Sequence, residues 1–550
     1  MRTTADIDAC RRALRERFPV WQPRTLAGWL DECARSHGAR PFVITDDVTL
    51  SYADVADRSR RIATGLAALG VQPGDRVGMV MANYPEFVTV KFAIARVGAL
   101  AVPFNYLYQA SELGFVLADS GCRVLVTMTG FGTLDYQGML DQIAPQWDSE
   151  NTPQHRAVPD LRHVVLLDTD GRARPGVRTV GDLAATAGAA PELDVAPDAP
   201  GDMLYTSGTT GSPKGVLVAH DSVLRTAYAS ALTRGFGDGR RILFSLPCYH
   251  MFGYVEGILA AMFVGGAVIP QPAFSAEGYF AGIQRHRASD ILCVPTMAVA
   301  MVESQTRAAY DLSSLEAVLC GSAPAPIWLW EQVRRDFGVD EIVTGYGMTE
   351  CGGAMTLTLP EDPLQLTSET VGRPKLAGAA SVPGTDDLVV YDTVDDELVS
   401  RGPATMLGYW NRPAETAAAL RDGWLFSGDL GVVRPDGYLQ VTGRSKEVYK
   451  SGGELVMPRE IEELLHGHPK ISQAFAFGIT DERWGEIGCV VVVAAPEASL
   501  SEDEVLDYCR ANLARFKVPK RVVFYDADAL PATPTGKVQK FRLAEEVRGC

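Results

Sequence analysis

The segment LYTSGTTGSPKGV, residues 204–216, concentrates glycines, hydroxyl side chains and one lysine in a short stretch of chain. Glycines let a backbone approach a polyanion and turn its N–H groups toward it. Hydroxyl groups add hydrogen-bond donors, and a lysine adds a compact positive charge. The composition therefore suits a loop that holds the phosphates of a nucleoside triphosphate. The residues that would do so are Thr206, Ser207, Gly208, Thr209, Thr210, Gly211 and Lys214.

This loop differs from a Walker A loop, in which Gly-Lys-Ser/Thr leads directly into a helix. Here Lys214 precedes Gly215, and Pro213 disfavours a helix that enters through this point. A flexible surface loop is the alternative interpretation of the same composition. The strand-like sequences MLY and GVLVAH on either side favour a loop held between two strands.

The elements around this loop alternate between strand and helix patterns. Residues 51–70 have apolar side chains at helical spacing, and Gly70 is an end signal. Strand-like sequences follow at RVGMVMAN, AVPFN and CRVLVTM, and the alternation returns over residues 200–345. Such alternation predicts a largely parallel sheet covered on both faces. The apolar helical positions are Val55, Ile62, Leu66 and Leu69.

Two further regions complete the chain. Residues 380–443 contain short strand-like sequences bounded by Gly and Asp, which predicts a small antiparallel part. After Arg444, the patterns PREIEELLHGH, GCVVVVAAP, EDEVLDYCRANLA and RVVFY predict a separate α+β unit. We therefore expect an α/β protein with two domains. The large N-terminal domain, residues 1–443, would combine layered α/β subdomains with the small antiparallel β part, and residues 444–550 would form a small α+β C-terminal domain.

The composition is that of a globular protein that functions in solution. The 550 residues are 47% hydrophobic and 22% charged, and 51 basic against 68 acidic side chains give a net charge of −17. This charge argues against nucleic acid or an anionic membrane as a partner. The longest apolar stretch, residues 254–270, is too short for a membrane span, and the N-terminal sequence lacks a signal-peptide core. The ten cysteines are scattered without a C-x-x-C pair, as is typical of the cytoplasm.

Several motifs together resemble those of the adenylate-forming enzymes, the ANL superfamily, which includes the AMP-binding acyl- and aryl-CoA synthetases. YTSGTTGSPKG resembles their signature loop, and GYGMTE at residues 345–350 resembles their second core motif. Residues 426–454 resemble the ribose-binding and hinge region, and PTGKVQKFRL at residues 534–543 resembles the C-terminal lysine motif. The motifs occur in family order over nearly the whole chain.

The resemblance implies a reaction in two steps and a C-terminal domain that is mobile. In the first step, a carboxylate oxygen attacks the α-phosphorus of Mg-ATP, which gives an acyl-adenylate and pyrophosphate. In the second step, a nucleophile such as the thiol of coenzyme A displaces AMP. The implied cofactors are ATP and Mg²⁺, with coenzyme A as the second substrate.

The resemblance also assigns residues to the first step. The glycine-rich loop would hold the β- and γ-phosphates, and Tyr346 would lie against the adenine. Thr349 would contact the α-phosphate, and Glu350 would help to hold Mg²⁺, a cation that prefers oxygen ligands. Lys537 would bridge the acid's carboxylate and the α-phosphate. The remaining nucleotide contacts would come from Gly321, Ser322, Ala323, Gly347, Met348 and, at the ribose, Asp429 and Arg444.

For the second step, Lys446 matches the hinge at which the C-terminal domain rotates. His250 in PCYHMFGYVEG matches a gate at the acyl pocket, although an isolated histidine is more often structural. Lys540 and Arg542, close to the C-terminal lysine motif, are expected to be surface charges. The loop that resembles the lining of the pantetheine tunnel consists of Lys450, Ser451, Gly452 and Gly453.

Two positions depart from the family pattern. Leu455 stands where relatives often have Asn or Gln, and Thr344 replaces a commoner glutamine, so both bear on the acyl or acceptor site. The segments that should bound the acyl pocket are mostly apolar, with Cys351-Gly352-Gly353 as a roomy floor, and they contain no obvious Lys or Asp. An aliphatic, aryl or arylpropenoic acid is therefore favoured over a free amino acid.

The leading hypothesis is an ATP-dependent acid–CoA ligase that acts on a small-molecule carboxylic acid as a cytoplasmic monomer or homodimer. One alternative keeps adenylation but passes the activated group to a carrier-protein thiol, an amine or a small inorganic nucleophile. A second alternative is a nucleotide-binding relative that has lost catalysis. The presence of Lys214, Glu350, Asp429, Arg444 and Lys537 argues against the second alternative.

Overall fold

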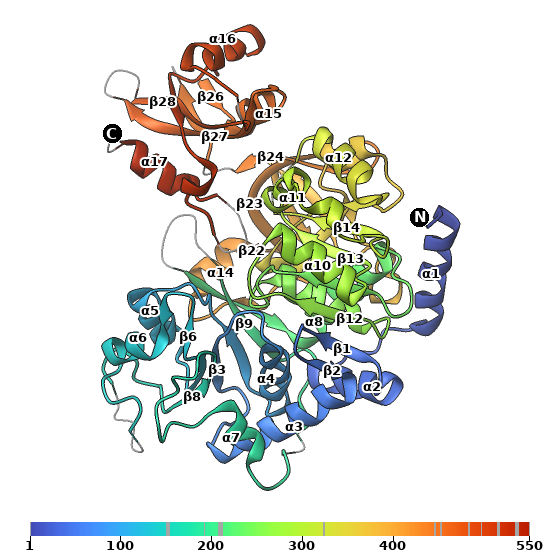
Figure 1. Ribbon diagram of the computed structural model, residues 1–550, viewed down its shortest axis with the longest axis vertical. Coiled ribbons are helices and arrows are strands. Elements are labelled where there is room, and N and C mark those ends of the chain that lie inside the picture. Colours follow the sequence, from blue (N-terminus) through green and yellow to red (C-terminus); the bar gives the residue numbers. More distant parts are fainter. Residues whose placement is uncertain are drawn as a thin grey trace.

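The computed structural model describes residues 2–149, 155–191, 193–206, 213–322, 325–444, 447–451, 454–481, 485–496, 498–513, 517–533 and 538–548. Two seven-stranded sheets and a smaller antiparallel sheet form a large part, and a C-terminal unit lies at one end of it (Figure 1). Within the described ranges, no helix is long and apolar enough to cross a membrane.

The first large sheet has the strand order β21-β10-β9-β4-β3-β5-β8. The pairs from β9 to β8 along this order are parallel, as predicted, whereas β10 pairs antiparallel with both β9 and β21. The strands are β3 (Arg76–Val80), β4 (Leu100–Pro103), β5 (Val124–Met128), β8 (His163–Leu167), β9 (Pro200–Thr206), β10 (Lys214–Ala219) and β21 (Gly408–Tyr409). The helices between them are α4 (Pro85–Arg96), α5 (Ala110–Ser120), α6 (Tyr136–Ile143) and α7 (Val180–Ala185), and a small hairpin pairs β6 (Gly130–Phe131) with β7 (Leu134–Asp135).

The second large sheet has the order β15-β14-β13-β11-β12-β1-β2, and only the β1-β2 pair is antiparallel. Its strands are β1 (Pro41–Ile44), β2 (Thr49–Ser51), β11 (Arg241–Phe244), β12 (Ala267–Pro270), β13 (Asp290–Cys293), β14 (Ala317–Cys320) and β15 (Glu341–Val343). The helices of this region are α1 (Thr4–Arg17), α2 (Leu26–His37), α8 (His220–Thr233), α9 (Ala260–Met262), α10 (Ala276–His286), α11 (Pro295–Glu303), η2 (Arg307–Ala309) and α12 (Ile327–Phe337).

Helix α3 (Tyr52–Ala68) confirms the helical pattern of residues 51–70. Ser51 caps its first turn in a reciprocal capping box with Asp54. The predicted apolar stripe is buried, and Gly70 follows the helix with a φ of +79°, which favours glycine. The helix therefore begins and ends where its sequence signals indicate.

The longest apolar stretch forms a buried π-helix, a short α-helix and a strand. The π-helix η1 (Phe252–Leu259) continues into α9, and β12 follows in the middle of the second large sheet. The sequence predicted a buried helix and strand here, but not the π-helical form. A π-helix is rare and often accompanies a functional site.

The predicted antiparallel part is a five-stranded sheet made of β19 (Val390–Val394), β20 (Glu397–Arg401), β22 (Leu420–Arg421), β23 (Trp424–Val433) and β24 (Leu439–Arg444). A second small antiparallel sheet contains β16 (Gly345–Met348), β17 (Gly353–Leu357) and β18 (Arg373–Pro374). Short helices lie between these strands: η3 (Thr349–Cys351), α13 (Leu364–Glu369), η4 (Gly378–Ala380) and α14 (Pro413–Ala419).

The C-terminal unit contains the helices and strands that its sequence predicts, together with strand β27 and helix α17, which were not predicted. Its two apolar clusters draw only on residues from Tyr449 to Val547, whereas the main cluster of the large part ends at Leu439. Its elements are β25 (Tyr449–Ser451), β26 (Glu454–Val456), α15 (Pro458–His466), β27 (Ile471–Asp481), β28 (Gly485–Ala494), α16 (Glu502–Asn512), β29 (Arg521–Phe524), η5 (Ala527–Ala529) and α17 (Lys540–Arg548).

Candidate active site

The glycine-rich segment connects two adjacent antiparallel strands. Thr206 ends β9 and Lys214 begins β10, and the two residues are direct partners in the ladder. This arrangement confirms that strands flank the loop on both sides and that no helix follows the lysine. The predicted phosphate contacts Ser207, Gly208, Thr209, Thr210 and Gly211 lie outside the described residues.

The edge strand β21 places Tyr409 beside the predicted phosphate lysine, Lys214. Val216 pairs with Tyr409 in the ladder, and Nζ of Lys214 lies 5.1 Å from the centre of the tyrosine ring. The same Nζ is 3.7 Å from Oε2 of Glu415. The ammonium group is therefore held between an aromatic ring and a carboxylate.

The second core motif runs along β16 into η3, and its close pairing with β17 requires its glycines. A Cβ atom at Gly347 would lie 2.1 Å from the carbonyl oxygen of Gly353, and one at Gly345 would lie 2.4 Å from that of Thr356. Such contacts are far inside van der Waals distance, so β16 can approach β17 only with glycine at both positions. Met348 and Thr349, which follow, are partly exposed.

Glu350 has a carboxylate that the fold holds in place. Glu350 is 6% exposed, and its Oε1 accepts a hydrogen bond of 2.9 Å from the hydroxyl of Tyr409. Burial and this carboxylate both raise the pKa of Tyr409, so the hydroxyl stays protonated and remains a donor. Tyr409 thus contacts both the predicted metal ligand and the predicted phosphate lysine.

The donor set around Glu350 fits Mg²⁺ that arrives with ATP. Among the described residues, no group of three or more His, Cys, Asp or Glu side chains is arranged to hold a metal ion. Mg²⁺ usually binds proteins through one or two carboxylates and completes its shell with water and substrate phosphates. The Glu350 carboxylate, which Tyr409 connects to the predicted phosphate lysine, is consistent with that mode of binding.

The predicted ribose ligands lie opposite each other on neighbouring strands. Asp429 of β23 pairs in the ladder with Arg444 of β24, of which only the backbone is described. Asp429 is 4% exposed, and the hydroxyl of Tyr346 donates to its Oδ2 at 2.5 Å. Burial and Asp429 both raise the pKa of Tyr346, so this hydroxyl also remains a donor. The structure thereby joins the predicted adenine contact to the predicted ribose contact.

The predicted adenine-side loop follows β14 and lies against the π-helix. A Cβ atom at Gly321 would lie 3.2 Å from the ring of Phe252, which leaves little room for a side chain. Ser322 has a φ of +75°, an uncommon conformation for a residue other than glycine and one that occurs at ligand sites. Ala323 lies outside the described residues.

His250 lies immediately before the π-helix. Its Nδ1 accepts a hydrogen bond of 3.2 Å from the N–H of Phe252, and its own backbone N–H donates to the carbonyl of Pro247 at 3.0 Å. The structure thus places His250 at the start of η1, and its predicted gating role stays a prediction.

The predicted floor of the acyl pocket contacts the same π-helix. A Cβ atom at Gly353 would lie 3.6 Å from Val255, so η1 packs directly against Gly353, the last residue of Cys351-Gly352-Gly353. Tyr254 is 2% exposed, and its ring lies 4.5 Å from Nζ of Lys91. Tyr254 therefore belongs to the core.

Only part of the predicted second-step site can be placed. Lys450 and Ser451 are on β25, and Ser451 is 7% exposed. The predicted hinge residue Lys446, the tunnel residues Gly452 and Gly453, and Lys537 lie outside the described residues. Thr344 is buried between β15 and β16, where its N–H donates to the Thr358 hydroxyl at 2.9 Å.

Lys540 is not the plain surface charge that the sequence suggested. Its Nζ lies 2.6 Å from Glu462 and 3.5 Å from Glu447, and its side chain is 21% exposed. Burial lowers its pKa, but the two carboxylates outweigh burial and the net shift is upward. The prediction was wrong because the carboxylates come from α15 and from the segment before β25, far away in the sequence.

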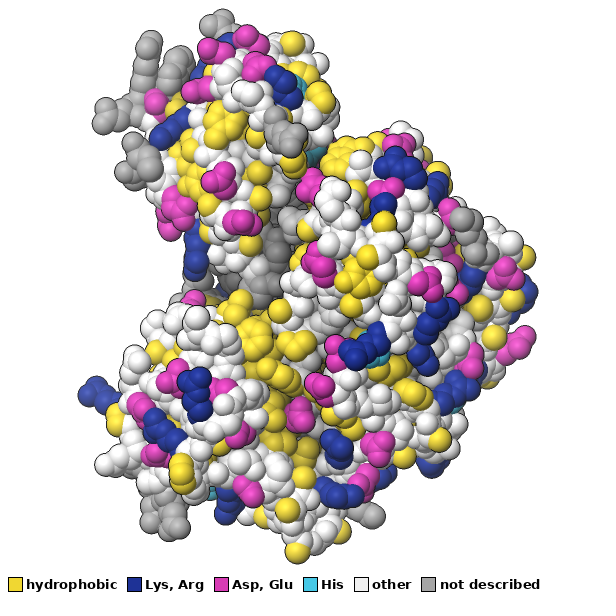
Figure 2. Space-filling model, viewed as in Figure 1, with side chains coloured by type: hydrophobic (Ala, Val, Ile, Leu, Met, Phe, Trp, Pro, Cys, Tyr) yellow, Lys and Arg dark blue, Asp and Glu magenta, His cyan; other side chains and the backbone are white. Residues whose placement is uncertain are grey.

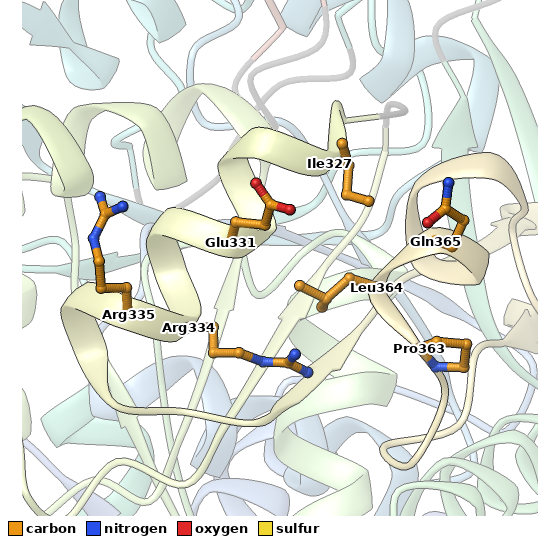
Figure 3. A pocket seen from close by; sticks show the side chains of 7 residues that line it. All are labelled: Ile327, Glu331, Arg334, Arg335, Pro363, Leu364 and Gln365. Atoms are coloured by element: carbon orange, nitrogen blue, oxygen red, sulfur yellow. The ribbon is translucent and has the colours of Figure 1, made fainter.

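A surface cavity of about 490 Å³ lies apart from these residues (Figure 3). It lies between α12 and the start of α13, and its arginines already have acidic neighbours: Arg334 is 3.3 Å from Asp340 and Arg335 is 3.0 Å from Asp336. The cavity contains none of the predicted site residues.

On the visible face, apolar side chains form a band on the large part below the C-terminal unit (Figure 2).

Comparisons with known proteins agree with this geometry. The chain matches the AMP-binding enzyme family over residues 30–410 and the AMP-binding enzyme C-terminal domain over residues 460–537. It is 35% identical over 526 residues to a methyl-dioxo-octahydro-indenyl propanoyl:CoA ligase of Mycobacterium tuberculosis, covering 95% of this chain and 99% of the relative. It is 34% identical to a feruloyl-CoA synthase of Amycolatopsis sp, with 94% and 97% covered. The structure of o-succinylbenzoate CoA synthetase from Bacillus subtilis with its acyl-adenylate intermediate has a TM-score of 0.77 at 28% identity, with 95% and 98% covered.

Proposed function

Because the chain belongs to the AMP-binding enzyme family and is an AMP-forming acid–CoA ligase, we propose that Lys214, Glu350 and Asp429 hold Mg-ATP for attack by a carboxylic acid. A carboxylate oxygen bonds to the α-phosphorus while the bond from that phosphorus to the pyrophosphate oxygen breaks. The observation that carries this proposal is the contact of Tyr409 with both Lys214 and Glu350. It brings a phosphate-binding cation and a metal-binding carboxylate to one place.

Each group has a physical role in this step. Lys214 and the loop that precedes it counter the negative charge that gathers on the leaving pyrophosphate. Asp429 accepts hydrogen bonds from the ribose hydroxyls, and Tyr346, hydrogen-bonded to Asp429, packs against the adenine. Mg²⁺ held by Glu350 and the phosphates would neutralise phosphate charge when bound. The remaining nucleotide contacts are Thr349, Gly321, Ser322, Ala323, Gly347 and Met348.

We propose that residues 444–550 act as the mobile domain that supplies the remaining groups. Lys537 bridges the acid and the α-phosphate in the first step. The C-terminal domain then rotates at Lys446, which withdraws Lys537 and brings the residues of the acceptor site to the acyl-adenylate. The thiol of coenzyme A attacks the acyl carbon, and the bond to the AMP oxygen breaks. The separate apolar clusters of the two parts support a boundary near residue 444. The pantetheine contacts are Lys450, Ser451, Gly452 and Gly453.

The acid is proposed to be an aliphatic, aryl or arylpropenoic acid that enters past His250. The packing of η1 against Gly353 of Cys351-Gly352-Gly353 gives an apolar wall and a floor of small residues. The relatives named above take a bulky polycyclic propanoic acid and an arylpropenoic acid, which fits a roomy pocket. We propose a cytoplasmic monomer or homodimer without a nucleic-acid partner. The free cysteines of the described residues support the cytoplasm, and the net charge of −17 argues against nucleic acid.

The test is pyrophosphate release from Mg-ATP over a panel of fatty, benzoic and cinnamic acids, each with and without coenzyme A. Mass spectrometry of the products identifies any thioester. The proposal predicts that one acid class gives catalytic release only with coenzyme A, together with an equal amount of acyl-CoA. Acid-dependent release without a thioester would contradict coenzyme A as the acceptor and favour a carrier-protein thiol, an amine or an inorganic nucleophile.

A further inference from the structure

Tyr409 lies between the two charged groups that the proposed function assigns to the phosphates and to Mg²⁺. Its hydroxyl donates to Oε1 of Glu350 at 2.9 Å, and its ring centre is 5.1 Å from Nζ of Lys214. We infer that Tyr409 is a positioning residue that fixes the Glu350 carboxylate and the Lys214 ammonium relative to each other. The inference rests on the proposed roles of Glu350 and Lys214 and adds an uncharged residue to them.

The backbone around Tyr409 is hydrogen-bonded to the segments that carry both charged groups. The N–H of Met406 donates to the carbonyl of Glu350 at 2.8 Å. The N–H of Trp410 donates to the carbonyl of Gly215, the residue after the phosphate lysine, also at 2.8 Å. The segment from Met406 to Trp410 therefore joins η3 to β10, and Tyr409 lies within it.

The orientation of Tyr409 is fixed from its other side by α14. Its own N–H donates to the hydroxyl of Thr416 at 2.9 Å. Gly408 has a φ of +144°, and a Cβ atom there would lie 2.9 Å from Cγ2 of Thr416. The missing side chain at Gly408 allows β21 to approach α14 this closely. The backbone of Tyr409 is thus held before any ligand binds.

The two contacts of Tyr409 use different parts of its side chain, so substitution can separate them. Phenylalanine keeps the ring that faces Lys214 and removes the hydroxyl that orients Glu350. Leucine removes both. Loss of a group that orients a metal ligand typically lowers metal affinity about tenfold or more. Loss of a partly exposed cation–π contact lowers affinity about two- to fivefold.

The experiment is equilibrium binding of ATP to the full-length protein at a series of Mg²⁺ concentrations, measured by calorimetry. We expect Tyr409→Phe to raise the Mg²⁺ concentration for half-maximal ATP binding about tenfold. The affinity for ATP measured in the absence of Mg²⁺ should stay within about twofold of the wild-type value. Tyr409→Leu is expected to weaken ATP binding without Mg²⁺ as well. Tyr438→Phe is the matched control, because Tyr438 donates at 2.8 Å to Asp362, another carboxylate, outside this site. It should behave as the wild type does.

Glu350→Gln separates failure of this inference from failure of the proposed function. If ATP binding no longer depends on Mg²⁺ in Glu350→Gln but keeps its wild-type Mg²⁺ dependence in Tyr409→Phe, the role of Tyr409 is wrong and the metal role of Glu350 stands. A wild-type Mg²⁺ dependence in Glu350→Gln would overturn both the role of Tyr409 and the metal role of Glu350. If Tyr409 acts through Glu350, the double variant binds Mg²⁺ no more weakly than Glu350→Gln alone. Should Tyr409→Phe not fold, Glu350→Asp tests the same contact, because the shorter side chain withdraws the carboxylate from the hydroxyl. A Mg²⁺ response unchanged in Glu350→Asp would then contradict the inference.

Discussion

A buried ion pair joins Glu256 of the π-helix beside the proposed acyl site to Lys375, and removal of Lys375 should loosen this helix. Nζ of Lys375 lies 2.6 Å from Oε1 of Glu256, and the two side chains are 0% and 2% exposed. Glu256 is on η1, and its carboxylate also accepts from the Ser230 hydroxyl. Lys375→Met keeps most of the side-chain volume but leaves the carboxylate of Glu256 without its charged partner.

The expected cost follows from the burial of both groups. Breaking a fully buried ion pair by removing one partner costs about 3–5 kcal/mol, because the remaining charge is uncompensated. In a domain of this size, that corresponds to a melting temperature lower by roughly 3–5 °C. Replacing both partners, as in Glu256→Gln with Lys375→Met, leaves no unpaired charge and should restore much of the loss.

Differential scanning calorimetry of the full chain measures this effect. Because η1 packs against Gly353 in the proposed floor of the acyl pocket, the single variant should also raise KM for the acid more than KM for ATP. Melting of Lys375→Met at the wild-type temperature would refute the anchoring role. A double variant no more stable than the single variant would show that an unpaired charge is not the cause.

Three further predictions concern the nucleotide, the two half-reactions and pH. Tyr346→Phe removes the donor to Asp429, a bond to a charged group, and should raise KM for ATP about tenfold with little change in KM for the acid, as steady-state kinetics can show. Lys537→Ala should nearly abolish adenylate formation while thioester formation from supplied acyl-AMP continues. Lys446→Pro should keep adenylate formation measurable and suppress thioester formation, because a fixed φ blocks the hinge. Equal loss of both half-reactions in either variant would contradict its role. Burial lowers the pKa of His220 to about 4, below its ordinary value, so the unfolded chain binds a proton more readily and stability should fall as pH drops from 6.5 toward 4. His220→Gln should flatten that decline in melting temperature.

The sequence predicted the parts of the site that its motifs carry. Lys214 is at a strand end beside a glycine-rich loop, and the glycines at Gly345 and Gly347 are present because β16 and β17 approach too closely for side chains. Both features depend on residues that are close together in the sequence, so a motif of fixed spacing can predict them. The alternation of strands and helices likewise indicated largely parallel sheet structure, because each strand and helix shows its own hydrophobic period, but it did not predict a division into two sheets.

Features that depend on distant contacts could not be predicted in the same way. Tyr409 is separated from Glu350 by 59 positions, and no local pattern links a tyrosine in MLGYWNRP to a carboxylate in GYGMTE. Glu256 on the π-helix pairs with Lys375, which is 119 positions away. Lys540 was expected at the surface because its carboxylate partners belong to other elements. In each case the decisive energy comes from a tertiary contact between charged or polar groups.

The central claim is that the site formed by Lys214, Glu350 and Asp429 activates an acid as an acyl-adenylate before coenzyme A takes part. Exchange of labelled pyrophosphate into ATP, measured without coenzyme A, tests this most directly. We predict exchange that requires both Mg²⁺ and the acid and is lost in Glu350→Gln. Exchange that appears only when coenzyme A is present, or ATP cleavage to ADP and phosphate, would contradict the account.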